Sequence, residues 1–145
     1  MFATFDYTSL PIIHIYMNNE IENDEDFDRF TNEWILIYSR RQPVNFVFHA
    51  EKVGLIPIKY AFKMSSFMKK LKKYSEQYLK KSVIVIDDYS ARRLLNLIFF
   101  LQPPVADVYV TCKPDLIDTI MENDFKEDGL EWEYIPPGKS MIPFL

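Results

Sequence analysis

The stretch "NFVFHAEKVGLIPIKYAFKMSSF", residues 45–67, decides the fold. It opens with the near-continuous apolar run "NFVFHA", which is typical of a buried strand. A short loop follows, and a helix is predicted to begin near Ile56 to Ile58, with Pro57 tolerated in its first turn. Strand, short loop and helix are the building unit of α/β proteins, and the junction between them is a common place for a functional site.

The same alternation continues on both sides of this stretch. Apolar segments at 11–18, 82–87 and 105–112 predict further strands, and 1–8 predicts a hairpin partner for the first of them. Helical spacing at 24–41, 91–102 and 113–123 separates the strands. We therefore expect an α/β fold in the order β-β-α-β-α-β-α-β-α, with helices packed on a mixed, mainly parallel sheet.

Local signals mark the ends of these elements. Asn23 is a predicted N-cap before an acidic first turn, and Pro43 ends that helix. Asp88 or Ser90 is expected to open the helix over 91–102. We expect a domain over 1–125 and an extended C-terminal arm over 126–145, with a strand at "LEWEYI" within that arm.

Composition bounds the function classes. The chain has 145 residues, 48% of them hydrophobic, and a net charge of -4, which gives no overall attraction to nucleic acid. No apolar run approaches the length of a membrane span, and the first residues lack the pattern of a signal peptide. With a single cysteine, Cys112, the sequence favours a reducing compartment, and we expect a cytoplasmic protein in which Cys112 is a small buried residue near a strand end.

The order of elements resembles the STAS (anti-sigma-factor-antagonist-like) fold and the related small Sec14-like domains. The resemblance covers roughly residues 2–123. It depends on the segments "FVFHAEKVGLIPIKYAFKMSSFMKKLKKY" and "SVIVIDDYSARRLLNLIFFLQPPVADVYVT". It implies an α/β domain that works by contacts with other proteins, because neither segment is a catalytic motif.

One departure from the family changes what the resemblance implies. STAS antagonists carry an Asp-Ser pair where the loop meets the helix, and a partner kinase phosphorylates that serine. Here Ile56, Pro57 and Ile58 occupy the matching place, and Ser65 and Ser66 follow two turns later. The phosphorylation switch therefore does not carry over, and we expect Ile56 and Ile58 to be packing residues or contact points.

Charge is unevenly distributed along the chain. From Lys59 to Lys81 there are eight lysines against Glu76, whereas 20–33 holds seven acids and 115–133 holds eight. Three interpretations stay open: a solvated face neutralised by the chain's own acids, pairing with an acidic patch on another subunit, or contact with anionic lipid. Nucleic acid is an unlikely partner because the run lacks arginine and the exposed aromatic pattern expected of base stacking. The predicted partner-binding residues are Lys69, Lys70, Lys72, Lys73, Lys80 and Lys81.

The C-terminal "EYIPPGKSMIPFL" combines apolar side chains with prolines that forbid a helix. Apolar groups on an extended arm need a surface to cover. The arm either packs back on its own domain or reaches a neighbouring subunit, and Ile142 and Phe144 are its predicted contact residues.

Polar residues offer weaker candidates. Asp87 and Asp88 end a strand, where paired acids could bind Mg²⁺ or act in acid-base chemistry, with Arg92 nearby as a further ligand contact. The favoured interpretation is that one acid caps the next helix and the other is solvated. His14 and His49 could meet across adjacent strands, but without a third ligand we interpret them as unrelated, and we predict no metal, cofactor or catalytic residue.

These observations favour a non-catalytic protein-protein interaction or assembly module, as a structural subunit of a large cellular or viral complex, with other subunits or its own copies as partners. The alternative is a Sec14-like lipid or small-ligand binding protein in which the helix containing "LLNLIFFL" lines an apolar pocket. An enzyme that uses Asp87, Asp88 and His49 ranks third.

Overall fold

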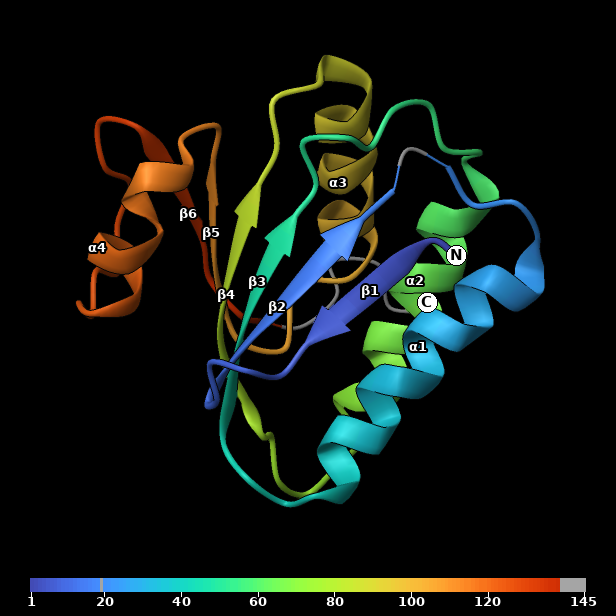
Figure 1. Ribbon diagram of the computed structural model, residues 1–145, viewed down its shortest axis with the longest axis horizontal. Coiled ribbons are helices and arrows are strands. Elements are labelled where there is room, and N and C mark those ends of the chain that lie inside the picture. The colour runs from blue at the N-terminus through green and yellow to red at the C-terminus, as the bar shows by residue number, and fades with distance from the viewer. Residues whose placement is uncertain (19, 139–145) are drawn as a thin grey trace.

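The sheet has the predicted mixed, mainly parallel arrangement. A computed structural model describes residues 1–18 and 20–138, and within these ranges six strands form one sheet in the order β1-β2-β3-β4-β5-β6 (Figure 1). The four central strands are parallel, and β1 and β6 pair antiparallel at the two edges. The strands are β1 (Ala3–Asp6), β2 (Ile12–Met17), β3 (Val44–His49), β4 (Leu79–Val85), β5 (Asp107–Thr111) and β6 (Trp132–Ile135).

Three helices connect the parallel strands in succession. They are α1 (Asp24–Ser39), α2 (Lys59–Leu71) and α3 (Tyr89–Leu101). Each connection advances by one strand in the same direction, and the right-handed rule for such crossovers places all three helices on one face of the sheet. The short 3₁₀ helix Pro114–Leu116 and α4 (Ile117–Met121) cover part of the opposite face (Figure 1).

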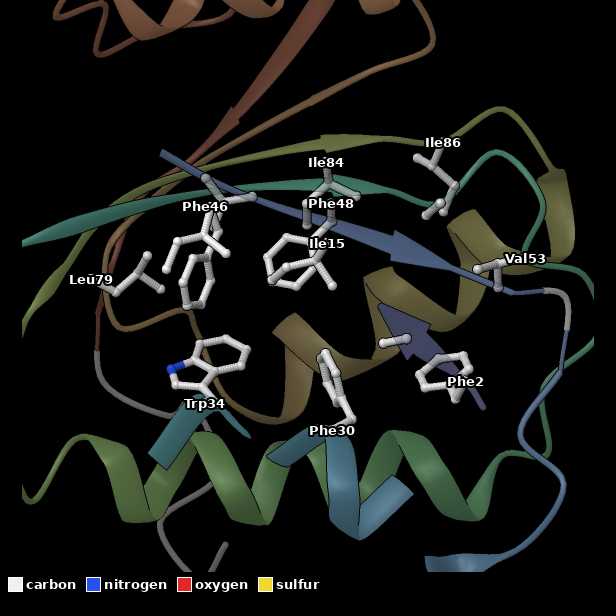
Figure 2. Packing of buried hydrophobic residues seen from close by; sticks show 14 of the residues in the cluster. Phe2, Ile15, Phe30, Trp34, Phe46, Phe48, Val53, Leu79, Ile84 and Ile86 are labelled. Atoms are coloured by element: carbon white, nitrogen blue, oxygen red, sulfur yellow. The ribbon is translucent and has the colours of Figure 1, made fainter. Parts of the chain in front are cut away.

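Alternation along the strands divides the apolar side chains between two cores. Phe46, Phe48 and Ile84 point toward Phe30 and Trp34 of α1 (Figure 2). On the opposite face, a smaller cluster contains Val83, Val85, Tyr109 and Ile120. Near-continuous apolar strands are therefore explained by burial on both faces, as expected for a parallel sheet.

Two of the predicted helix starts are confirmed. The Asn23 side chain accepts a hydrogen bond from the Asp26 backbone N–H at 2.9 Å, and the Asp88 carboxylate accepts one from the Ala91 N–H at 3.0 Å. In contrast, Ile58 precedes α2 without a side-chain hydrogen bond. Across the described ranges, no helix combines the length and the apolar character needed to cross a membrane.

The prediction for Cys112 is wrong in one respect. It lies next to a strand end, as expected, but its side chain is exposed. The last residue of β5 is Thr111, whose hydroxyl accepts a hydrogen bond from the Lys113 N–H at 3.0 Å. Thr111 is therefore the buried residue at the end of this strand, and Cys112 is the first residue after the strand.

Candidate functional site

The junction between β3 and α2 has an apolar surface, and neither serine nor threonine lies at the helix start. Ile56 is 9% exposed and belongs to the core, whereas Ile58 is 61% exposed. Leu55 and Phe62 are also exposed, so apolar side chains reach solvent around the first turns of α2. Ile56 is therefore a packing residue, and Ile58 is free to contact another molecule.

The serines farther along α2 differ in their surroundings. Ser65 is buried, and its hydroxyl donates to the Ala61 carbonyl at 2.7 Å. Ser66 is exposed. A kinase could reach Ser66 on the folded protein, but Ser65 would have to leave its place between α2 and α3, because its hydroxyl also lies 3.4 Å from the Ile98 carbonyl.

The lysines at the start of α2 are neutralised by the acidic start of α1. Lys59 lies 3.1 Å from Asp24, and Lys63 lies 3.6 Å from Asp24 and 3.9 Å from Asp28. The hydroxyl of Tyr60 also donates to Asp24 at 2.9 Å. These contacts lower the pKa of the Asp24 carboxyl and raise that of the Lys59 ammonium, chiefly through the bond between the two. This part of the lysine run is occupied by the chain's own acids.

The lysines at the other end of α2 lack such partners. Among the described residues, no ion pair or side-chain hydrogen bond involves the ammonium groups of Lys69, Lys70, Lys72 or Lys73. Lys80, at the start of β4, donates to the Gln77 carbonyl at 2.6 Å and is exposed. We call Lys69, Lys70, Lys72, Lys73 and Lys80 the basic end.

Two arginines join the same end of the molecule. Arg40 and Arg41 directly follow α1, and the loops after α1 and α2 lie together (Figure 1). The hydroxyl of Tyr38 donates to the Gln77 side chain at 2.9 Å, which ties these loops to each other. The sequence separates these cations by about 30 residues, and the fold brings them to the end of the sheet where β3 and β4 begin.

Lys81 does not belong to the basic end, although the sequence grouped it with those lysines. Its side chain is buried, and its ammonium donates to the carbonyls of Ile120 at 2.9 Å, Met121 at 3.4 Å and Asn123 at 2.6 Å. These carbonyls lie at the C-terminal end of α4, where a cation is favourable. Burial lowers the pKa of Lys81, and the nearby carboxylate of Asp124 opposes that shift.

The two histidines meet on the sheet face that α1, α2 and α3 leave uncovered. His14 Nδ1 lies 2.9 Å from His49 Nε2, and the ring of Tyr16 stacks on His49 with centroids 4.5 Å apart. The histidine centroids are 5.1 Å apart, so the rings meet edge to edge and share one proton in a hydrogen bond. The interpretation of the two as unrelated is therefore wrong. No third ligand completes a metal site among residues 1–18 and 20–138.

This pair predicts an acid-sensitive stability. Burial, and then the charge of His14, lower the pKa of His49 below its ordinary value of 6.5, and Glu51 opposes them. As the pH falls through that ordinary value, the unfolded chain binds a proton that the folded chain resists, so the free energy of unfolding decreases. The sequence has two histidines, and both belong to this pair. Between about pH 5 and 8, the decrease in the free energy of unfolding therefore reports on the pair.

The measurement is urea denaturation of the parent and of His49→Gln at several pH values in this range. We expect the variant to lose less stability than the parent between neutral and mildly acidic pH. A double variant, His14→Gln with His49→Gln, serves as the control that has no histidine. Identical pH dependence in the parent and the single variant would contradict the assignment.

The acids after β4 are placed as the favoured interpretation predicts. Asp88 caps α3, and Asp87 is exposed. Arg92 pairs with Glu133 of β6 instead of with either aspartate. In the described structure these three residues therefore have different partners, and their role as a ligand contact stays a prediction. Ile142 and Phe144 lie outside the described residues.

Comparison of the chain with protein-family models, with curated proteins and with solved structures finds no match. The α/β architecture is established by the structure alone. The STAS-like resemblance stays a proposal.

Proposed function

We infer that this chain is a non-catalytic, STAS-like assembly module that binds an acidic surface on another protein through its basic end. The observation that carries the proposal is that the lysines of residues 59–81 differ in their partners. Lys59 and Lys63 are neutralised by α1, whereas Lys69, Lys70 and Lys72 have no acidic partner among the described residues. Clustered like charges repel one another, and a complementary acidic surface relieves that repulsion and speeds association.

The arrangement of α2 favours a protein partner over a membrane. A helix that inserts into a lipid interface presents basic and apolar groups side by side. The exposed aliphatic residue Ile58 and the exposed Phe62 lie at the N-terminal end of α2, whereas the free lysines begin at Lys69 and have Tyr74 as the exposed aromatic residue beside them. From Phe62 to Lys69 the helix rises about 10 Å. The buried residues Met68 and Leu71 already use the apolar stripe next to the lysines.

The test compares two full-length variants with the same change in net charge. One replaces Lys69, Lys70, Lys72 and Lys73 with glutamine. The matched control replaces four lysines that form ion pairs, Lys59, Lys63, Lys113 and Lys126. A polyglutamate peptide serves as the probe, and its affinity is measured by fluorescence anisotropy at low and physiological salt.

We expect the first variant to bind the peptide roughly tenfold to a hundredfold more weakly than the parent, because each exposed pair contributes about 0.2–1 kcal/mol. The control should lose much less. An equal loss in both variants would show that net charge alone acts and would refute the proposal. Binding to phosphatidylserine vesicles without binding to the peptide would favour the lipid alternative. Thermal unfolding of each variant confirms that it is folded.

A further inference from the structure

An apolar cavity that is partly open to solvent lies between the helices and the sheet. Its volume is about 160 Å³, and its walls include Trp34 of α1, Met64 of α2, Leu95 of α3 and Val108 of β5. Among the described lining residues, hydroxyl groups come from Ser82 and Tyr60 alone, and the Tyr60 hydroxyl is already bound to Asp24. Most voids in protein interiors are smaller than a water molecule, so this volume is unusual for a native core.

The cavity lies beneath the middle of α3. Ala91 and Leu101, near the two ends of that helix, are buried. The apolar residues between them that line the cavity are each partly exposed; these are Leu94, Leu95, Ile98 and Phe99. An apolar helix that covers a sheet normally buries this stripe completely. The middle of α3 is therefore under-packed, and a guest in the cavity would complete its burial.

The walls determine which chemistry fits. With no charged side chain among the described lining residues, an ionised group would lose its hydration without compensation. A dry apolar cavity of about 150 Å³ in another protein accommodates benzene or xenon. The volume here is close to that value and is small for the acyl chains of a membrane lipid.

We propose that this cavity is a binding site for a compact, uncharged apolar molecule about the size of a single aromatic ring. The proposal is independent of the basic end, because none of the basic-end lysines lines the cavity. It also makes the small-ligand alternative from the sequence more specific: the "LLNLIFFL" segment of α3 supplies one wall, and the ligand is a ring-sized molecule.

The experiment titrates toluene into the full-length protein and follows thermal unfolding together with methyl NMR spectra. We expect saturable shifts at methyl groups of Leu94, Leu95 and Ile98. Above the dissociation constant, the unfolding midpoint should rise by about 3–6 °C for each tenfold increase in toluene. Octanoate, which is longer and carries a carboxylate, should bind more weakly.

Two cavity-filling variants, Ala91→Leu and Ala106→Val, test the location separately. Both residues are buried and line the cavity, so a larger side chain should occupy the space and abolish the toluene response. Asn96→Leu is the matched control, because it adds the same side chain to the exposed side of α3 and should leave the response unchanged. If one filling variant fails to fold, the other still gives the answer.

Three results would overturn the proposal. The first is the absence of a saturable response in the full-length protein. The second is a response that both filling variants retain, which would place toluene elsewhere. The third is a response that develops only after Ile142→Ser and Phe144→Ser are introduced together, because the chain's own C-terminal segment would then be the occupant.

Discussion

Replacing Trp34 with alanine is expected to lower the free energy of unfolding by about 3–5 kcal/mol. Trp34 is 4% exposed and joins three elements of the main core. Its ring packs edge-on against Phe46 of β3 at 5.0 Å and against Phe67 of α2 at 5.4 Å. Removal of the indole leaves a void that rigid neighbours fill incompletely, next to a cavity that already exists.

The measurement is guanidinium denaturation followed by far-ultraviolet circular dichroism. Small domains have a total stability of about 5–15 kcal/mol, so Trp34→Ala should remove a large share of it. Trp132→Phe is the control, because Trp132 is partly exposed on the opposite face of the sheet and should change stability far less. If the loss in Trp34→Ala were as small as the loss expected for the control, the main core would not depend on Trp34.

The parts of the fold predicted correctly from the sequence depend on local chemistry. Asn23 and Asp88 cap helices through backbone groups three residues away, and that spacing is visible in the sequence. The apolar runs of β3 and β4 are also recognisable in the sequence, because a strand buried on both faces needs apolar residues at nearly every position. Crossover handedness then restricts the order of the strands.

Contacts between distant residues could not be predicted in this way. Arg92 meets Glu133 across 41 positions, whereas the sequence grouped Arg92 with Asp87 and Asp88 as a ligand contact. The histidine pair depends on the register of β2 against β3, in which Tyr16 is opposite His49. The sequence identified α3 as a pocket wall, but the volume of a cavity depends on how well three helices pack together, which no local pattern encodes.

Lys81 is buried because of an irregularity in β4, which the regular alternation of side chains along a strand does not predict. In the pairing of β3 with β4, Val44 is opposite Leu79 and Asn45 is opposite Lys81, so the register shifts at Lys80. Without that irregularity, Leu79 and Lys81 would share a face, because side chains two residues apart do so. The extra residue turns Lys81 to the face covered by α4, whereas Leu79 stays in the main core.

Replacing Lys81 with methionine is therefore expected to lower the free energy of unfolding by about 2–4 kcal/mol, because methionine preserves much of the volume and removes three charge-assisted hydrogen bonds. The carbonyl of Ile120 would lose its partner in a buried place. A five-residue helix such as α4 has little stability of its own, so it depends on tertiary contacts of this kind.

Two measurements distinguish this role from a contribution to the basic end. Urea denaturation gives the loss of stability, and hydrogen exchange of the amides in 117–125 should accelerate more than exchange in β3. Lys80→Met is the matched control, because the adjacent lysine is exposed and bonds to Gln77 alone among the described residues. We expect that control to change stability by less than about 0.5 kcal/mol. Equal effects of the two substitutions would mean that Lys81 does not hold α4 against the sheet.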